Sequence, residues 1–180
     1  MLRRLLTLAL AIVLAAVPLP TLAQLPASGS SPAILNASEA GAILPPAVFF
    51  RGQSASIQAR NSAGVRFSKD ALLLVALVDT SGYSSSVQQK YQAYLITETA
   101  IEIGGHKLPP GAYGCGFVAN ETFVVMDLGG HDLFTAKASH DADLRRPTPL
   151  QILAAPAAHT YRLYAGRNFV ELSATQPTAP

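Results

Sequence analysis

Eight consecutive apolar residues occupy Ala71–Val78, which reads ALLLVALV and lies between Asp70 and Asp79. A run of this length fits a strand better than a helix, which in globular proteins usually has about ten residues or more. Because the run contains no polar side chain, neither of its faces suits contact with solvent. It is therefore interpreted as a strand buried on both faces.

Short strands separated by turn residues continue on both sides of this run. Residues 54–60 alternate small or apolar side chains with polar ones, which is the period of a strand. A short helix is allowed after Ser84–Ser86, where Val87 and Tyr91 begin a helical spacing of apolar residues. Further strands are expected at 47–50, 94–103, 112–118, 122–128, 133–138, 161–164 and 168–172, the last two joined by the hairpin signal Ala165-Gly166-Arg167.

Many short strands with glycine-rich turns are typical of an all-β protein. We expect a single β-sandwich, or a partly open barrel, of about eight to nine short, mostly antiparallel strands. This domain is expected to span residues 47–172. Residues 24–46, rich in Ala, Ser, Gly and Pro, are interpreted as a flexible lead-in, and residues 173–180 as a disordered tail.

The first 23 residues have the order of a secretory signal peptide. Arg3 and Arg4 form a basic start, and Thr21-Leu22-Ala23 supplies small residues for a cleavage site. The uncharged run at 5–17 has 13 residues, fewer than the about 20 that a membrane span requires. We therefore expect cleavage after residue 23, export to the periplasm or the cell exterior, and no transmembrane span in the mature chain.

The mature chain is expected to carry no net charge. The full sequence has 13 Lys and Arg and 11 Asp and Glu. Removal of Arg3 and Arg4 with the signal peptide leaves equal numbers of basic and acidic residues. A neutral domain exerts no long-range field on polyanions, so nucleic acid is not an expected partner.

Cys115 is the single cysteine of the sequence. An intramolecular disulfide is therefore excluded even in an oxidising compartment, and the domain must be held together by its core. Because Cys115 lies between two glycines in an expected strand, it is interpreted as a closely packed, unreactive thiol.

Two segments repeat one pattern: residues 100–108 read AIEIGGHKL and residues 125–133 read VMDLGGHDL. Paired glycines at such positions are typical of hairpin turns that need positive φ, an explanation that does not require the histidines. In a simple meander, both turns would lie at the same end of one sheet, roughly 10 Å apart. The alternative hypothesis is therefore a divalent metal site using His106, His131 and Asp132; otherwise no cofactor is expected.

Residues 79–94 read DTSGYSSSVQQKYQAY and follow the most apolar strand. Tyr combined with Ser and Gly is typical of adaptable recognition surfaces, because Tyr offers a large contact area at a small entropic cost. The alternative interpretation is a solvated connection whose tyrosines cover the edge of the core. The candidate ligand-binding residues are Asp79, Ser81, Tyr83, Tyr91 and Tyr94.

Catalytic motifs are absent from the sequence. It contains no G-x-S-x-G, S-x-x-K, H-E-x-x-H, P-loop or G-x-G-x-x-G pattern. Glu98 and Glu102 share one face of the strand expected at 94–103, but they would lie about 13 Å apart, too far for a glycosidase pair. The sequence therefore favours a protein without enzymatic activity, without deciding the question.

The segment Ile101–Tyr113, IEIGGHKLPPGAY, resembles the phrase I-x-I-G-G-x-x-L-P-x-G-x-Y of exported bacterial β-proteins that form a domain of unknown function. The run 77–117, with VDTSGY and KYQAY, is similar to exported proteins of soil bacteria. This resemblance implies a bacterial, exported β-sandwich. It implies no catalytic residues.

These features lead to three functional hypotheses. The first is an exported binding or structural module of the bacterial cell envelope that recognises a protein, peptide or glycan through residues 79–94. The second is a small metal-binding protein, conceivably a metal-dependent hydrolase, that uses the two GGH turns. The third is a subunit of an envelope assembly whose exposed strand edges pair with a partner.

Overall fold

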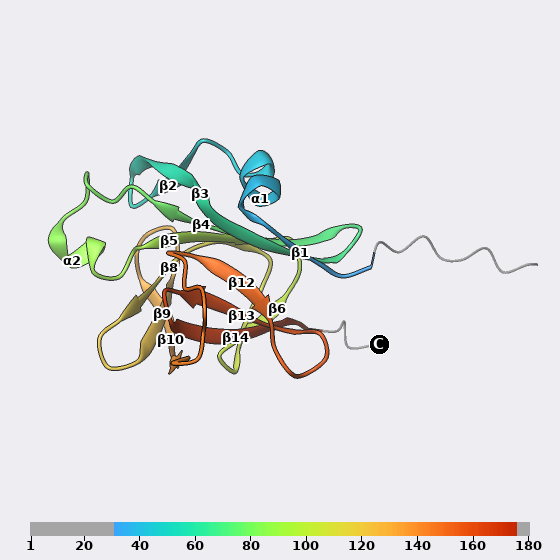
Figure 1. The fold of residues 1–180 in the computed structure, drawn as a ribbon. Helices are drawn as coiled ribbons and strands as arrows, with labels where there is room; N and C mark the ends of the chain where they lie inside the picture. The colour runs from blue at the N-terminus through green and yellow to red at the C-terminus, as the bar shows by residue number, and fades with distance from the viewer. Residues whose placement is uncertain (1–30, 176–180) are drawn as a thin grey trace, which may run out of the picture.

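The computed structural model describes residues 31–175, which form two antiparallel β-sheets packed against each other (Figure 1). The all-β sandwich predicted from the sequence is confirmed. The predicted signal peptide, residues 1–23, lies outside the described residues, as do residues 176–180 of the predicted tail. No helix within residues 31–175 is long and apolar enough to cross a membrane.

The first sheet has eight strands in the order β1-β3-β4-β5-β8-β9-β10, with β2 paired to the beginning of β3. Its members are β1 (Ala33–Leu35), β2 (Ala47–Phe50), β3 (Gln53–Ser68), β4 (Ala71–Val78), β5 (Ala93–Thr97), β8 (Gly111–Val118), β9 (Thr122–Met126) and β10 (Asp132–Lys137). The apolar run ALLLVALV is β4, with the bounds that the sequence predicts.

The second sheet has six strands in the order β12-β13-β14-β6-β7, with β11 paired to β14. Its members are β6 (Ile101–Ile103), β7 (His106–Leu108), β11 (Ser139–His140), β12 (Gln151–Ala154), β13 (Thr160–Ala165) and β14 (Asn168–Ala174). The predicted hairpin at 165–167 joins β13 to β14, with Ala165 opposite Asn168.

The single strand expected over 94–103 is divided between the two sheets. β5 ends at Thr97, whose hydroxyl donates to the carbonyl of Thr99 over 2.7 Å, and the chain turns there. After this turn, β6 continues in the second sheet. Glu98 and Glu102, expected on one strand, therefore belong to a turn and to a strand of the other sheet.

The segment expected to be a flexible lead-in is ordered from β1 onward. The helix α1 (Ala37–Ile43) begins at Asn36, whose side chain accepts from the amides of Ser38 and Glu39. The Glu39 carboxylate accepts in return from the amide of Asn36, which completes a capping box. This N-x-x-E pattern was the sequence signal for a helix, and the abundance of small residues obscured it.

Apolar side chains are buried on both faces of the first sheet. Its inner face packs on the second sheet through side chains such as Leu73 and Val75 of β4. The alternate residues Leu74 and Ala76 face outward and are covered by α1. The outer faces of β5 and β9 are covered by β2 and by the connection that contains the short helix α2 (Ser85–Gln88). Burial of β4 on both faces is thus confirmed.

Candidate functional site

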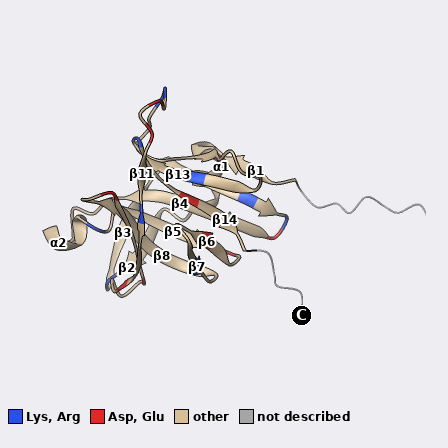
Figure 2. Ribbon diagram, turned by 90° about the horizontal axis from the view of Figure 1, so that it is seen from below, with Lys and Arg blue, Asp and Glu red and all other residues tan. Residues whose placement is uncertain are grey.

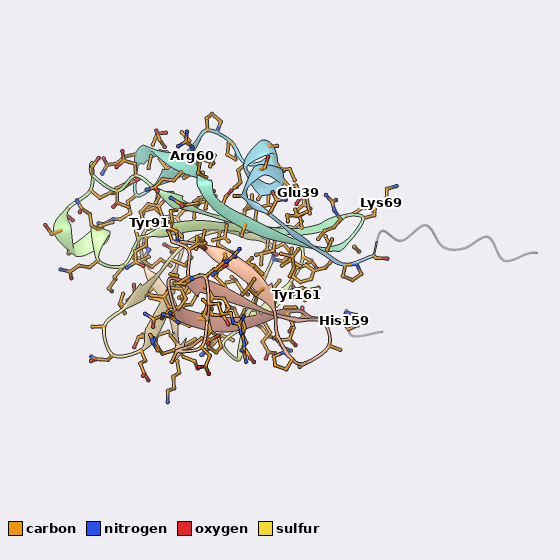
Figure 3. The ribbon with its side chains drawn as sticks, in the orientation of Figure 1. Glu39, Arg60, Lys69, Tyr91, His159 and Tyr161 are labelled. Atoms are coloured by element: carbon orange, nitrogen blue, oxygen red, sulfur yellow. The ribbon has the colours of Figure 1, made fainter. Side chains whose placement is uncertain are left out.

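The connection between β4 and β5 packs its tyrosines into an aromatic cluster. Tyr91 is fully buried and stacks on Phe50, with ring centroids 3.8 Å apart and an interplanar angle of 15°. Tyr83 meets both rings edge-on, and its hydroxyl donates to the carbonyl of Phe50 over 3.0 Å. Tyr94, on β5, is also buried in this cluster. Figure 3 places Tyr91 near α2, at the end of the molecule away from His159.

The cluster depends on a glycine of the neighbouring strand. A Cβ on Gly114 of β8 would lie 2.5 Å from the ring of Phe50 and 3.0 Å from that of Tyr91. The hydroxyl of Tyr91 has no hydrogen-bond partner among the described residues, and burial raises the pKa of Tyr91 far above its usual value. The three tyrosines predicted to contact a ligand therefore lie in the core, where the alternative interpretation expected them.

Asp79 and Ser81, the other two residues predicted for this surface, are exposed. The Asp79 carboxylate accepts from the amide of Ser81 over 3.0 Å. This hydrogen bond, together with one from the Ser81 side chain, lowers the pKa of Asp79. The pair forms a local turn of the backbone, and the predicted role of both residues in ligand binding stays a prediction.

The two GGH turns belong to different sheets. The first joins β6 to β7 in the second sheet, and the second joins β9 to β10 in the first sheet. The prediction that a single meander brings both histidines to the same end of one sheet is therefore wrong. The reason is that the chain crosses between sheets at Pro109–Pro110, before β8 begins.

Each residue of the hypothetical metal site has its own partner. The His106 ring stacks on Phe134, with ring centroids 4.5 Å apart. Nδ1 of His131 lies 3.0 Å from the Asp127 carboxylate, whose pKa is lowered chiefly by the hydrogen bond from the His131 amide. Asp132 accepts from the Lys90 ammonium over 2.6 Å.

Within residues 31–175, no group of three or more His, Cys, Asp and Glu side chains is placed to hold a metal ion. The metal site thus stays a prediction, and its three proposed ligands do not form a cluster within residues 31–175. The Lys90–Asp132 pair has a different consequence: it joins the connection after β4 to the second GGH turn, at one end of the sandwich.

Cys115 of β8 is buried between the two sheets. Burial raises the pKa of its thiol to about 12, so the thiolate is not populated at neutral pH. A Cβ on the adjacent Gly116 would lie 2.3 Å from the carbonyl oxygen of Lys90, which shows how closely this strand is packed. These contacts agree with the interpretation of Cys115 as an unreactive, structural residue.

The outer face of the second sheet carries a groove of about 590 Å³. Figure 2 looks at this side of the molecule, where basic and acidic positions both occur on the sheet. The Gly104–Gly105 turn of the first GGH segment also borders the hollow. We call it the polar groove, after its polar lining residues Glu102, Lys137, Ser139, Thr160, Arg162, Glu171 and Ser173.

Arg162 is the most firmly held side chain in the polar groove. Its Nε donates to the Glu171 carboxylate over 3.0 Å, and the two residues are directly opposite each other on β13 and β14. The centre of its guanidinium lies 4.4 Å above the ring of Phe169, which also contacts Tyr164. The guanidinium is thus oriented by one ion pair and one cation–π contact while its side chain keeps 26% of its surface exposed.

The polar groove was missed by the sequence analysis, although one signal for it was present. The two-residue turn Gly166-Arg167 fixes the register of β13 against β14. Counting outward from it places Arg162 opposite Glu171 on the polar face of an alternating hairpin. The sequence does not show which segments line the rest of the polar groove, because β6 and the segment around Lys137 are distant in the chain from the β13–β14 hairpin.

The comparisons with known proteins add no identification. No protein family, curated protein or solved structure matches this chain.

Proposed function

We propose that this protein is an exported binding module of the bacterial cell envelope and that its ligand occupies the polar groove. Export is supported by the signal-peptide pattern of residues 1–23. Binding is supported chiefly by one observation: the outer face of the second sheet presents an oriented guanidinium in a hollow of about 590 Å³. That volume falls in the range of small-molecule sites.

The groove suits binding because its strands are held in place and its central Arg162–Glu171 pair is formed before a ligand arrives. Thr160 and Arg162 on β13, Glu171 and Ser173 on β14, and Glu102 on β6 lie on three adjacent, paired strands. Side chains on such strands lose little conformational entropy when they contact a ligand. The connection after β4 offers less, because its two tyrosines, Tyr83 and Tyr91, are already buried in the core.

The test compares two exposed ion pairs. The double variant Arg162→Ala/Glu171→Ala removes the centre of the polar groove, whereas Lys90→Ala/Asp132→Ala removes an exposed pair that does not border it. Purified protein and both variants are screened by thermal shift against neutral glycans, acidic glycans and peptides. A ligand at 100 times its Kd should stabilise the native protein by about 2.7 kcal/mol.

We expect at least one ligand class to raise the Tm of the native protein and of the Lys90→Ala/Asp132→Ala variant. The same ligand should leave the Tm of the groove variant unchanged. Equal stabilisation of the groove variant would show that the ligand binds elsewhere, and the proposal would then fail.

A further inference from the structure

We infer that the ligand of the polar groove is a neutral glycan, a chain of uncharged sugars that is recognised through its hydroxyl groups. This inference rests on the proposed function and names its ligand class. Three features support it: the balance of charge in the groove, the row of hydrogen-bonding side chains across the sheet, and the pairing of the floor strand β14 with β13 and with β6.

The charges that line the polar groove cancel. Glu102 and Glu171 provide two carboxylates, and Lys137 and Arg162 provide two cations. Glu171 is held by Arg162 at 3.0 Å, and Glu102 lies opposite Lys107 on the adjacent strand. A charged ligand would gain from one sign and lose to the other, so the lining favours no ion of either sign. An uncharged ligand meets no such opposition.

One row of polar side chains runs across four adjacent strands. In register, Thr160 of β13 lies opposite Ser173 of β14, Ser173 opposite Glu102 of β6, and Glu102 opposite Lys107 of β7. With neighbouring strands about 4.8 Å apart, the row extends over roughly 14 Å. It presents two hydroxyls, one acceptor and one donor in sequence. Thr160, Ser173 and Glu102 line the polar groove, and Lys107 lies beyond its border. Sugar hydroxyls, which both donate and accept, can pair with each of these side chains.

A peptide fits this surface less well. Extended peptides usually join a sheet through main-chain hydrogen bonds at an open edge. The floor of the polar groove is β14, which is paired with β13 on one side and with β6 on the other. Next to the residues of β14 that pair with β6, the carbonyl of Glu171 accepts a hydrogen bond from the amide of Gly104. One face of the Phe169 ring is covered by Arg162, which leaves less aromatic surface for a peptide side chain.

The experiment is affinity gel electrophoresis of the purified protein in gels that contain a single polysaccharide. Dextran, mannan and laminarin serve as neutral probes, alginate and polygalacturonate as acidic probes, and an immobilised peptide library covers the peptides. The variants are Glu102→Gln and Thr160→Ala, with Lys90→Ala as the control outside the groove. Circular dichroism and Tm confirm that each variant is folded.

We expect a neutral polysaccharide to retard the protein, with little change between low and high salt, because no ion pair is formed with the ligand. Glu102→Gln should weaken this binding about tenfold by removing a charged acceptor, and Thr160→Ala should weaken it less. The Lys90→Ala control should migrate like the native protein.

Two other results would overturn the inference, and they differ in what they leave standing. Binding of an acidic glycan or a peptide that is lost in Glu102→Gln would refute the neutral glycan and keep the polar groove as the binding site. Binding that is unchanged in both groove variants, or no binding to any probe, would refute the inference and the proposed function together.

Discussion

The outer faces of the two sheets have opposite characters. That of the first sheet is covered by α1, β2 and the connection after β4, and it buries the aromatic cluster of Phe50, Tyr83 and Tyr91. That of the second sheet is left open and carries the polar groove around Arg162 and Glu171. Both sheets share the apolar layer between them, so the difference lies in their outward side chains, which are mostly apolar in the first sheet and polar in the second, and in what covers them.

This difference shows that composition is a poor guide to a recognition surface. Residues 79–94 have the tyrosines and serines of an adaptable surface, yet their tyrosines are fixed by stacking and by a hydrogen bond to the main chain. The polar groove has an unremarkable composition, and its side chains come from five strands: β6, β10, β11, β13 and β14. Covering one face leaves the other open, where we propose the ligand binds, and this comparison can be tested by mutation.

The largest expected effect compares one phenylalanine from each outer face. Phe50→Ala should destabilise the protein by about 3–5 kcal/mol, because it empties a fully buried site and leaves Tyr91 without its stacking partner. Phe169→Ala should cost only about 1 kcal/mol, since this ring is partly exposed. Urea unfolding of both variants gives the two free energies. Similar losses would contradict the contrast between a covered and an open face.

A smaller effect distinguishes two tyrosines within the covered face. Tyr83→Phe should lower the free energy of unfolding by about 1 kcal/mol, because the carbonyl of Phe50 loses a buried hydrogen bond. Tyr91→Phe should raise it by about 1 kcal/mol, because it removes a buried hydroxyl that has no partner among residues 31–175. Urea titrations of the two variants measure both changes in the free energy of unfolding. A destabilised Tyr91→Phe would mean that this hydroxyl is satisfied in solution, for example by a buried water.

The smallest effects concern the two exposed ion pairs. In a double-mutant cycle, Lys90 and Asp132 should couple by about 0.5 kcal/mol, because their side chains are 47% and 41% exposed. Arg162 and Glu171 should couple by about 1 kcal/mol, since Arg162 is less exposed and already oriented by Phe169. Added salt should weaken the first coupling more than the second. The reverse order would indicate that the polar groove is less organised than its contacts suggest.

Several local features were predictable because they depend on neighbours in the chain. The run ALLLVALV has no polar side, and it forms the doubly buried β4. The hairpin at Ala165-Gly166-Arg167 follows from its turn residues, and the short helix after Ser84 agrees with the spacing of Val87 and Tyr91; both signals act over a few positions. In contrast, the composition of residues 24–46 predicts a flexible lead-in where β1 and α1 form, although the sequence contains the capping pair Asn36 and Glu39.

The candidate site was less predictable, because pairing across the sandwich is not encoded locally. The two GGH turns look alike in sequence, yet the chain changes sheets between them, so His106 stacks on Phe134 while His131 lies against Asp127. Tyr91 could equally have faced a ligand or the core. Its place was settled by Gly114, a residue of another strand that leaves room for the ring.

Periodicity, turn residues and apolar runs were sufficient for the all-β class and for most strand positions, because each of these signals acts within a few residues. The sequence also carries a signal-peptide pattern, and it predicts zero net charge for a chain cleaved after residue 23. Which outer face is covered depended on long-range packing of β2, α1 and the connection after β4. The polar groove exists because β6, β13, β14 and the end of β10 meet in space, and contacts between distant segments are set by the packing of the whole domain.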